Sequence, residues 1–254
     1  MWKLLILTAT TIASPVYAQT CAQADAALAQ AYTQMKEGGS HSYAGSANEN
    51  QRETAETRFH QTLSTYLQQS DSWACRFPRT TRAGIIIYTA PNGRLRSFSW
   101  DAQSGGTLRE YHNLLQYRTP SGRSATQKGE GILTGIYSDT LGQHGTAYFV
   151  TSIGKYSNTL YGQSLSIWQI SNDGLRPLNI IRTSKATNTL SYEYSASHSG
   201  RNEDFAYDAR SKTISFPLVP KADANHPDAA YGAAHVSTRR IRYRFNGEQF
   251  VRLN

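Results

Sequence analysis

From Phe77 to the end of the chain, short strand-like runs alternate with turn signals, and this pattern restricts the fold more than any other feature. A run at residues 84–89 is followed by a turn signal at 91–93 and by a second run at 95–100. Further runs lie at 111–117, 131–137, 147–152, 164–170, 178–183, 190–194, 205–207, 213–218, 240–245 and 250–253. Because no helical pattern separates them, the sequence predicts an antiparallel β-sandwich or barrel rather than a parallel α/β fold. A propeller is less favoured, since no repeat of fixed length is present.

The first 18 residues have the form of a secretory signal. Lys3 gives a positive start, an apolar run follows over residues 4–12, and the small residue Ala18 marks the expected cleavage site. This run is too short for a transmembrane helix, and no later segment approaches 18 apolar residues. The sequence therefore predicts an exported protein, periplasmic or secreted, without a transmembrane segment.

Two cysteines, Cys21 and Cys75, remain after cleavage, and an oxidising compartment favours a disulfide between them over a free reactive thiol. Helical spacing of apolar residues predicts one helix over about residues 22–36 and another over about 51–69. In an antiparallel pair, the start of the first helix lies beside the end of the second, where the two cysteines stand. The predicted parts are a signal peptide (1–18), a disulfide-tied helical hairpin (19–76) and an antiparallel β domain (77–254).

Charge is divided along the same boundary. The chain carries a net charge of +8, and arginine outnumbers lysine by 19 to 7. Residues 19–75 hold three basic and six acidic residues, whereas residues 76–254 hold 22 basic and 12 acidic ones. A basic β domain favours an anionic partner. Since nucleic acid is a poor partner for an exported protein, we expect an acidic protein or an anionic component of the cell envelope.

Arginines alternate with apolar residues over positions 240–245. On a strand, this spacing places Arg240, Arg242 and Arg244 on one face. Arg94 and Arg96 form a shorter version of the pattern, and we expect one of them to join the other three in a single positive patch. The planar guanidinium group suits two-point contact with carboxylate or phosphate. An alternative interpretation explains the same pattern: the arginines form a solvated strand face that protects a sheet edge from aggregation.

A polar and aromatic segment at residues 100–112 offers an alternative function. If it folds back as a hairpin, the carboxylates of Asp101 and Glu110 come together near His112, which are the groups that acid–base hydrolysis requires. This hypothesis, an envelope hydrolase, needs all three side chains in one pocket. A loop in which Asp101 makes a turn hydrogen bond explains the same residues.

No pattern indicates a metal or a cofactor. Two cysteines are too few for a thiolate metal site, and His226, Asp228 and His235 share a loop without metal-ligand spacing. Exposed aromatic side chains on a β face anchor partners, although they also fill sandwich cores. Because no catalytic spacing is recognisable, the sequence favours a non-enzymatic binding or inhibitory protein that uses a basic, aromatic-rich β face.

Overall fold

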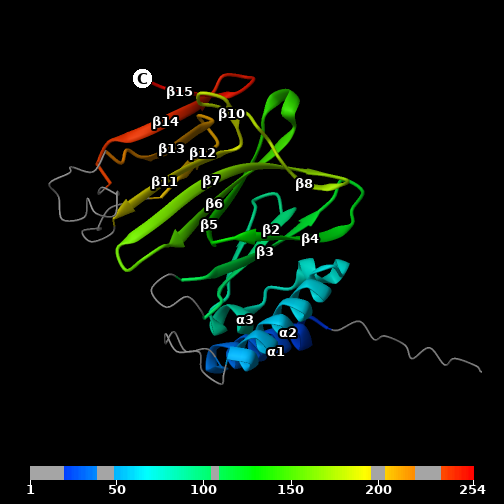
Figure 1. The fold of residues 1–254 in the computed structure, drawn as a ribbon. Helices are drawn as coiled ribbons and strands as arrows, with labels where there is room; N and C mark the ends of the chain where they lie inside the picture. The colour runs from blue at the N-terminus through cyan, green and yellow to red at the C-terminus, as the bar shows by residue number, and fades with distance from the viewer. Residues whose placement is uncertain (1–19, 39–48, 104–108, 196–203, 221–235) are drawn as a thin grey trace, which may run out of the picture.

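The computed structural model describes residues 20–38, 49–103, 109–195, 204–220 and 236–254. The predicted signal peptide lies outside these ranges, as do His226, Asp228 and His235. Figure 1 shows the long helices at one end of the described chain and the strands in layers above them. None of the described helices is long and apolar enough to cross a membrane.

The helices belong almost entirely to the N-terminal part. They are α1 (Cys21–Gly38), α2 (Glu49–Leu67), the 3-10 helix η1 (Ser70–Ala74), α3 (Pro78–Ala83) and a later 3-10 turn, η2 (Gly142–His144). The predicted disulfide is present: Cys21, at the start of α1, is bonded to Cys75, just after η1, with their Cα atoms 5.4 Å apart. This bond is consistent with a periplasmic or secreted protein.

Three sheets hold the described strands. The first sheet has the order β1-β2-β3-β4, and its strands are β1 (Ile86–Thr89), β2 (Leu95–Asp101), β3 (Tyr111–Arg118) and β4 (Ser124–Glu130). The central sheet has the order β11-β7-β6-β5, with β8 added on β7; its strands are β5 (Ile132–Thr140), β6 (Thr146–Lys155), β7 (Leu160–Ser171), β8 (Gly174–Pro177) and β11 (Thr189–Ser195). The C-terminal sheet has the order β10-β9-β15-β14-β13-β12; its strands are β9 (Ile181–Arg182), β10 (Ala186–Thr187), β12 (Ala206–Asp208), β13 (Thr213–Pro217), β14 (Arg240–Phe245) and β15 (Phe250–Arg252).

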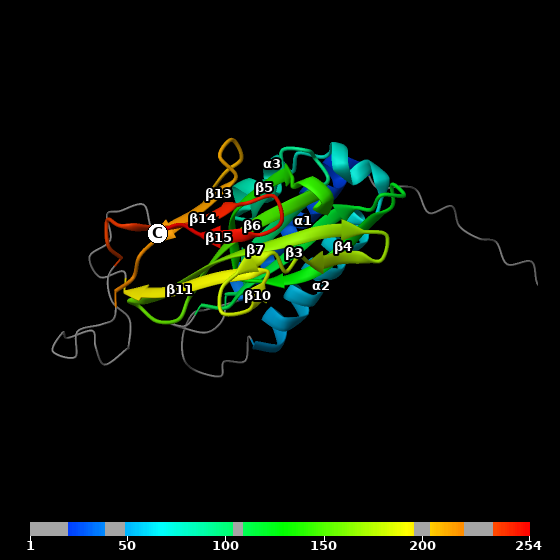
Figure 2. The ribbon, with the colours of Figure 1, turned by 90° about the horizontal axis from the view of Figure 1, so that it is seen from above.

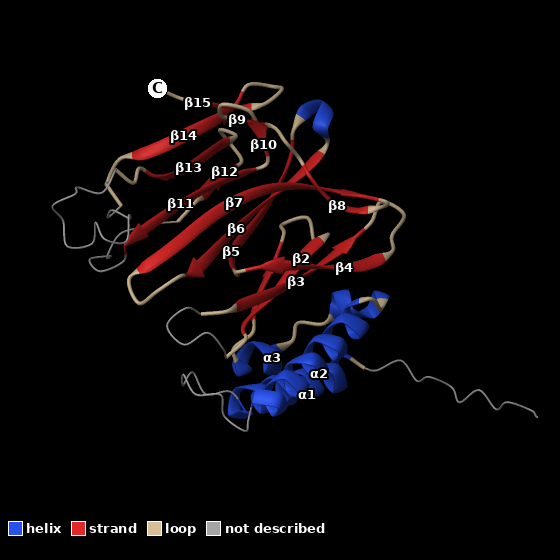
Figure 3. Cartoon of the chain, in the orientation of Figure 1, coloured by secondary structure: helices blue, strands red, loops and turns tan. Residues whose placement is uncertain are grey.

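The helices and the three sheets stack as four layers with a hydrophobic core in each interface (Figure 3). From above, the strands overlie α1 and α2 (Figure 2). All strand pairs are antiparallel except β15 with β9. The predicted antiparallel, sandwich-like β fold with a disulfide-tied helical hairpin is therefore confirmed.

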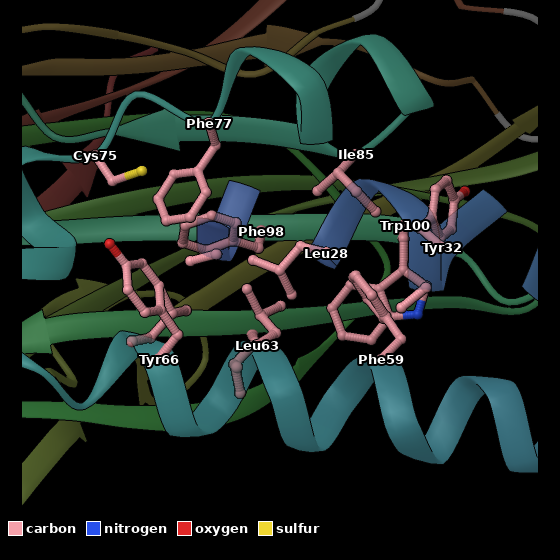
Figure 4. Close-up of a cluster of buried hydrophobic side chains, with 14 of the residues drawn as sticks. Leu28, Tyr32, Phe59, Leu63, Tyr66, Cys75, Phe77, Ile85, Phe98 and Trp100 are labelled. Carbon is pink, nitrogen blue, oxygen red and sulfur yellow. The ribbon is translucent and has the colours of Figure 1, made fainter. Parts of the chain in front are cut away.

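The core between the helices and the first sheet is the most aromatic part of the N-terminal half (Figure 4). Leu28 from α1 and Leu63 from α2 meet Phe98 and Trp100 from β2, and all four are almost fully buried. Phe59 packs edge-on against Trp100, with ring centroids 5.1 Å apart. This packing covers the helix-facing side of β2 and the neighbouring part of β3.

Strand β2 is buried on both faces, because the central sheet covers the face opposite the helices. Phe98 and Trp100 point toward the helices, whereas Leu95 enters the core between the two sheets. Ser99 confirms this direction, since its hydroxyl accepts a hydrogen bond from the backbone N–H of Leu133 in β5. Arg96 shares the face of Phe98 and therefore lies under the helices.

Helix α3 occupies residues for which the sequence predicts the start of the β domain. Pro78 stands in its first turn, where a missing N–H is tolerated, and Gly84 ends it with φ +118°. Its first amides are capped from α1: the carboxylate of Asp25 accepts hydrogen bonds from the N–H groups of Arg79 (2.9 Å) and Thr80 (2.8 Å). The helical part therefore continues to residue 83.

Candidate functional site

Strand β14 carries its alternating arginines on the outer face of the C-terminal sheet. The register with β13 places Arg242 opposite Ser215 and Arg244 opposite Thr213. Tyr243 points the other way, into the core against the central sheet. Both Arg242 and Arg244 are exposed, and neither guanidinium group has a hydrogen-bond or ion-pair partner in the described part of the chain. The guanidinium groups are therefore available to an external anion.

A depression of about 430 Å³ lies beside these two arginines. Thr213, Ser215 and Leu253 are among the residues that line it, and Leu253 is one of the exposed large hydrophobic residues. Asp208 also lines it, but its carboxylate already accepts hydrogen bonds from the hydroxyl of Ser211 (2.6 Å) and the N–H of Arg210 (2.9 Å). The lining of the depression therefore includes the guanidinium groups of Arg242 and Arg244, the hydroxyls of Ser211, Thr213 and Ser215, the apolar side chain of Leu253 and one carboxylate, that of Asp208.

The third arginine of this strand has a structural contact instead. Arg240 is half-buried, and its Nη2 donates to the carbonyl oxygens of Asp204 (2.8 Å) and Ser215 (3.0 Å). Through these bonds Arg240 joins β14 to its neighbour. We therefore restrict the candidate anion site to Arg242 and Arg244.

Neither Arg94 nor Arg96 joins this patch, so the expectation of a single positive surface that includes either of them is wrong. Both belong to the first sheet, which the central sheet separates from the C-terminal sheet. Arg94 is exposed at the turn before β2 and donates to the carbonyl of Thr119 (3.1 Å). Arg96 is only 4% exposed, because the helical layer covers its face of β2.

The three residues of the hydrolase hypothesis lie on two different faces of the first sheet. The register pairs Trp100 with His112 and Asp101 with Tyr111, and consecutive residues of a strand point to opposite faces. Asp101 lies near Arg109 (3.8 Å) and accepts a hydrogen bond from the N–H of Gln103 (2.7 Å). Only Glu110 and His112 come together, at 3.1 Å. The single pocket that this hypothesis requires is therefore not formed.

His112 instead joins the first sheet to helix α2. Its Nδ1 lies 2.8 Å from the carboxylate of Glu56, and its Nε2 lies 3.1 Å from that of Glu110. The hydrogen bond to Glu56 raises the pKa of His112, and the bond to Glu110 adds to the increase; partial burial opposes both. The imidazolium is therefore bound by two carboxylates from different layers.

Replacing His112 with Gln should remove a pH-dependent part of the stability. Because the pKa is raised in the folded state, the favourable contribution is complete below the unfolded value of about 6.5 and is lost as the pH rises through the folded value. The side chain is 37% exposed, so we expect less than about 1 kcal/mol. Urea unfolding from pH 5 to pH 9 measures it: the difference between wild type and His112→Gln should shrink with rising pH. A constant difference would contradict the proposed ion pairs.

A cleft of about 1350 Å³ lies between the first and central sheets. Its lining includes the small residues Ser152, Gly154, Gly162, Ser164 and Ser166 of β6 and β7. The signal in the sequence is the alternation of these small residues along the two strands. That alternation does not by itself predict a cleft, because only the strand register shows that the residues share one face.

The described residues hold no group of three or more His, Cys, Asp or Glu side chains arranged to bind a metal ion. Comparisons with protein-family models, with curated proteins and with solved structures find no match to this chain.

Proposed function

We propose that this protein is an exported, non-enzymatic binding or inhibitory protein that holds an acidic partner on the outer face of its C-terminal sheet. One observation carries the proposal. Arg242 and Arg244 lie on the same face of β14, both are exposed, and neither has an acidic partner among the described residues. In a folded protein, unpaired arginines on a rigid strand keep their full capacity for charge-assisted hydrogen bonds.

The partner is expected to present carboxylates or phosphates together with some apolar surface. Guanidinium groups bind both anions at two points, and the hydroxyls of Thr213 and Ser215 add neutral hydrogen-bonding groups beside them. Leu253, at the rim, offers a contact for an apolar side chain of the partner. An acidic protein and an anionic envelope polymer both fit this description.

Reversing the two charges should abolish most of this binding. The double variant Arg242→Glu/Arg244→Glu is expected to weaken binding of a deca-glutamate peptide at least tenfold, because each charge-assisted hydrogen bond contributes about 1.5–3 kcal/mol. Fluorescence anisotropy with labelled peptide measures the affinity, and inorganic polyphosphate as a second probe distinguishes carboxylate from phosphate preference. The affinity of wild type should also fall with added salt.

The matched control is the double variant Arg79→Glu/Arg82→Glu, on exposed positions of α3. It changes the net charge by the same amount at the opposite end of the stack of layers. Retention of binding by this control, together with loss in the β14 variant, supports a local site. Equal losses in both variants would show that only the overall charge matters and would reject the proposal.

A further inference from the structure

The cleft between the first and central sheets is large enough for an elongated ligand. Its volume of about 1350 Å³ exceeds the roughly 300–1,000 Å³ of ordinary small-molecule pockets. Strand β3 contributes Tyr111, Asn113 and Leu115 to one wall, and β6, β7 and β11 form the other. The site is separate from Arg242 and Arg244, which lie in the C-terminal sheet on the far side of the central sheet.

One wall of the cleft is a row of hydroxyl groups on a sheet face. The hydroxyl oxygens of Ser152 and Ser164 are 2.8 Å apart, and those of Ser166 and Thr189 are 2.9 Å apart. A hydroxyl has one donor and two acceptor positions, so each pair uses only part of its capacity. The remaining donors and acceptors are available to a ligand with many polar groups of its own.

An aromatic ring lies on the same wall. Gly154 and Gly162 are opposite each other in the register of β6 and β7, and the ring of Tyr156 lies against both. A Cβ atom built on Gly162 would be 2.6 Å from Cε2 of Tyr156, whereas one on Gly154 would be 3.4 Å from Cε1. Neither glycine has a positive φ, so the close approach of the Tyr156 ring, and not the backbone conformation, favours glycine at position 162.

Tyr156 is at the same time 46% exposed. One side of the ring is therefore held against the sheet, while a large part of it remains accessible in the cleft. A flat, fixed aromatic surface beside a row of hydroxyls matches the two surfaces of a sugar ring. The C–H bonds of a sugar lie on its faces and contact aromatic rings, and its hydroxyls lie at its edge and form hydrogen bonds.

Charges of both signs line the cleft. The basic residues are Arg109, His112, Lys128 and Lys155, the acidic ones are Glu110 and Glu193, and His112 and Glu110 form an ion pair. This mixture favours an uncharged ligand over the polyanion that suits the β14 face. An extended peptide is also less suitable, because peptides add to sheet edges, whereas this wall is a sheet face whose backbone groups are bonded to neighbouring strands.

We propose that this cleft binds a neutral oligosaccharide, with one sugar ring stacked on Tyr156 and neighbouring hydroxyls bonded to Ser152, Ser164 and Ser166. The inference does not rest on the anion site of β14. It assigns the protein a second ligand, of a different chemical class, in a different layer interface.

Titration calorimetry of the full chain with cellotetraose, maltotetraose and tetra-N-acetylchitotetraose tests the proposal. At least one of the three should bind, and the fluorescence of Trp168, which lines the cleft, should change in parallel. Tyr156→Ala is expected to weaken that binding about tenfold or more, and Tyr156→Phe should retain most of it, because stacking needs only the ring. Tyr88→Ala, at an exposed tyrosine of β1 outside the cleft, should leave the affinity unchanged.

A glycine variant tests the position of the ring without removing it. Gly162→Ala should displace Tyr156 and weaken binding severalfold, because the added Cβ would lie 2.6 Å from Cε2 of the ring. Failure of all three tetrasaccharides to bind overturns the proposal, as does equal affinity of wild type and Tyr156→Ala. Arg242→Glu/Arg244→Glu should leave sugar binding intact. The failure of one proposal can therefore be distinguished from the failure of the other.

Discussion

Replacing Arg96 with Ala is expected to lower the free energy of unfolding by about 4 kcal/mol, because the substitution removes a charged donor from three buried acceptors. The guanidinium group donates to the carbonyl oxygens of Cys75 (2.9 Å) and Ser72 (2.8 Å) and to the side-chain oxygen of Gln116 (3.0 and 2.6 Å). Because Arg96 is only 4% exposed, water cannot replace these bonds.

Aromatic rings complete the surroundings of this buried cation. The guanidinium carbon lies 5.1–5.2 Å from the ring centroids of Trp73, Phe77 and Phe98. Burial lowers the pKa of Arg96 to about 10, so the group stays charged at neutral pH. Lysine cannot reproduce the planar fork, and Arg96→Lys should therefore recover only part of the lost stability.

Urea unfolding followed by fluorescence measures the effect, with Arg94→Ala as the matched control. Arg94 is exposed on the same hairpin, and its loss should cost less than about 1 kcal/mol. If Arg96→Ala and Arg94→Ala destabilise the protein equally, the buried network does not have the role assigned to it.

Removing the disulfide by Cys21→Ser/Cys75→Ser should cost a similar amount, about 4 kcal/mol, for a different reason. The bond closes a loop across a sequence separation of 54 and restricts the unfolded chain, and it also fixes the start of α1 beside the end of η1. Thermal or urea unfolding of wild type with and without a reducing agent should give the same difference as the double variant. A loss below about 1 kcal/mol would contradict this expectation.

The two effects should not be additive. Arg96 holds the carbonyl of Cys75, the same residue that the disulfide fixes. Once the disulfide is absent, the segment around residue 75 is less constrained. Arg96→Ala should then lower the free energy of unfolding by less than it does when the disulfide is present. The double-mutant cycle of Arg96→Ala with Cys21→Ser/Cys75→Ser measures this coupling directly.

The helical hairpin and most strands were predictable because their signals are local. Apolar spacing marks α1 and α2, and apolar runs with turn residues mark most of the strands. Strand β4 is missed because its sequence, SATQKGE, is polar, and β8 (GLRP) and β10 (AT) are missed because neither contains a run of apolar residues. Helix α3 is missed because it is only six residues long and its cap, Asp25, comes from α1.

The candidate sites were harder to predict, since they depend on which face of a strand another layer covers. Arg96 shares one face of β2 with Phe98 and Trp100, and these large apolar neighbours are the signal that Arg96 is buried. The spacing of Arg94 and Arg96 suggests a short arginine repeat instead and hides that signal. Asp101 and His112 were expected together because they are close in the sequence, whereas a hairpin register places them on opposite faces. The cleft depends on two sheets at once, so no single segment indicates it.

The position of β15 has a consequence for biosynthesis. This strand lies between β9 and β14, and its Phe250, completely buried, packs against Phe149 of the central sheet (5.7 Å between ring centroids). During translation, the N-terminal layers can form from nearby segments, but the C-terminal sheet stays in two pieces until residue 252 has been added. The surface around Phe149 that β15 covers therefore stays exposed until that strand has been made, and exposed apolar surface of this kind favours aggregation before folding is complete.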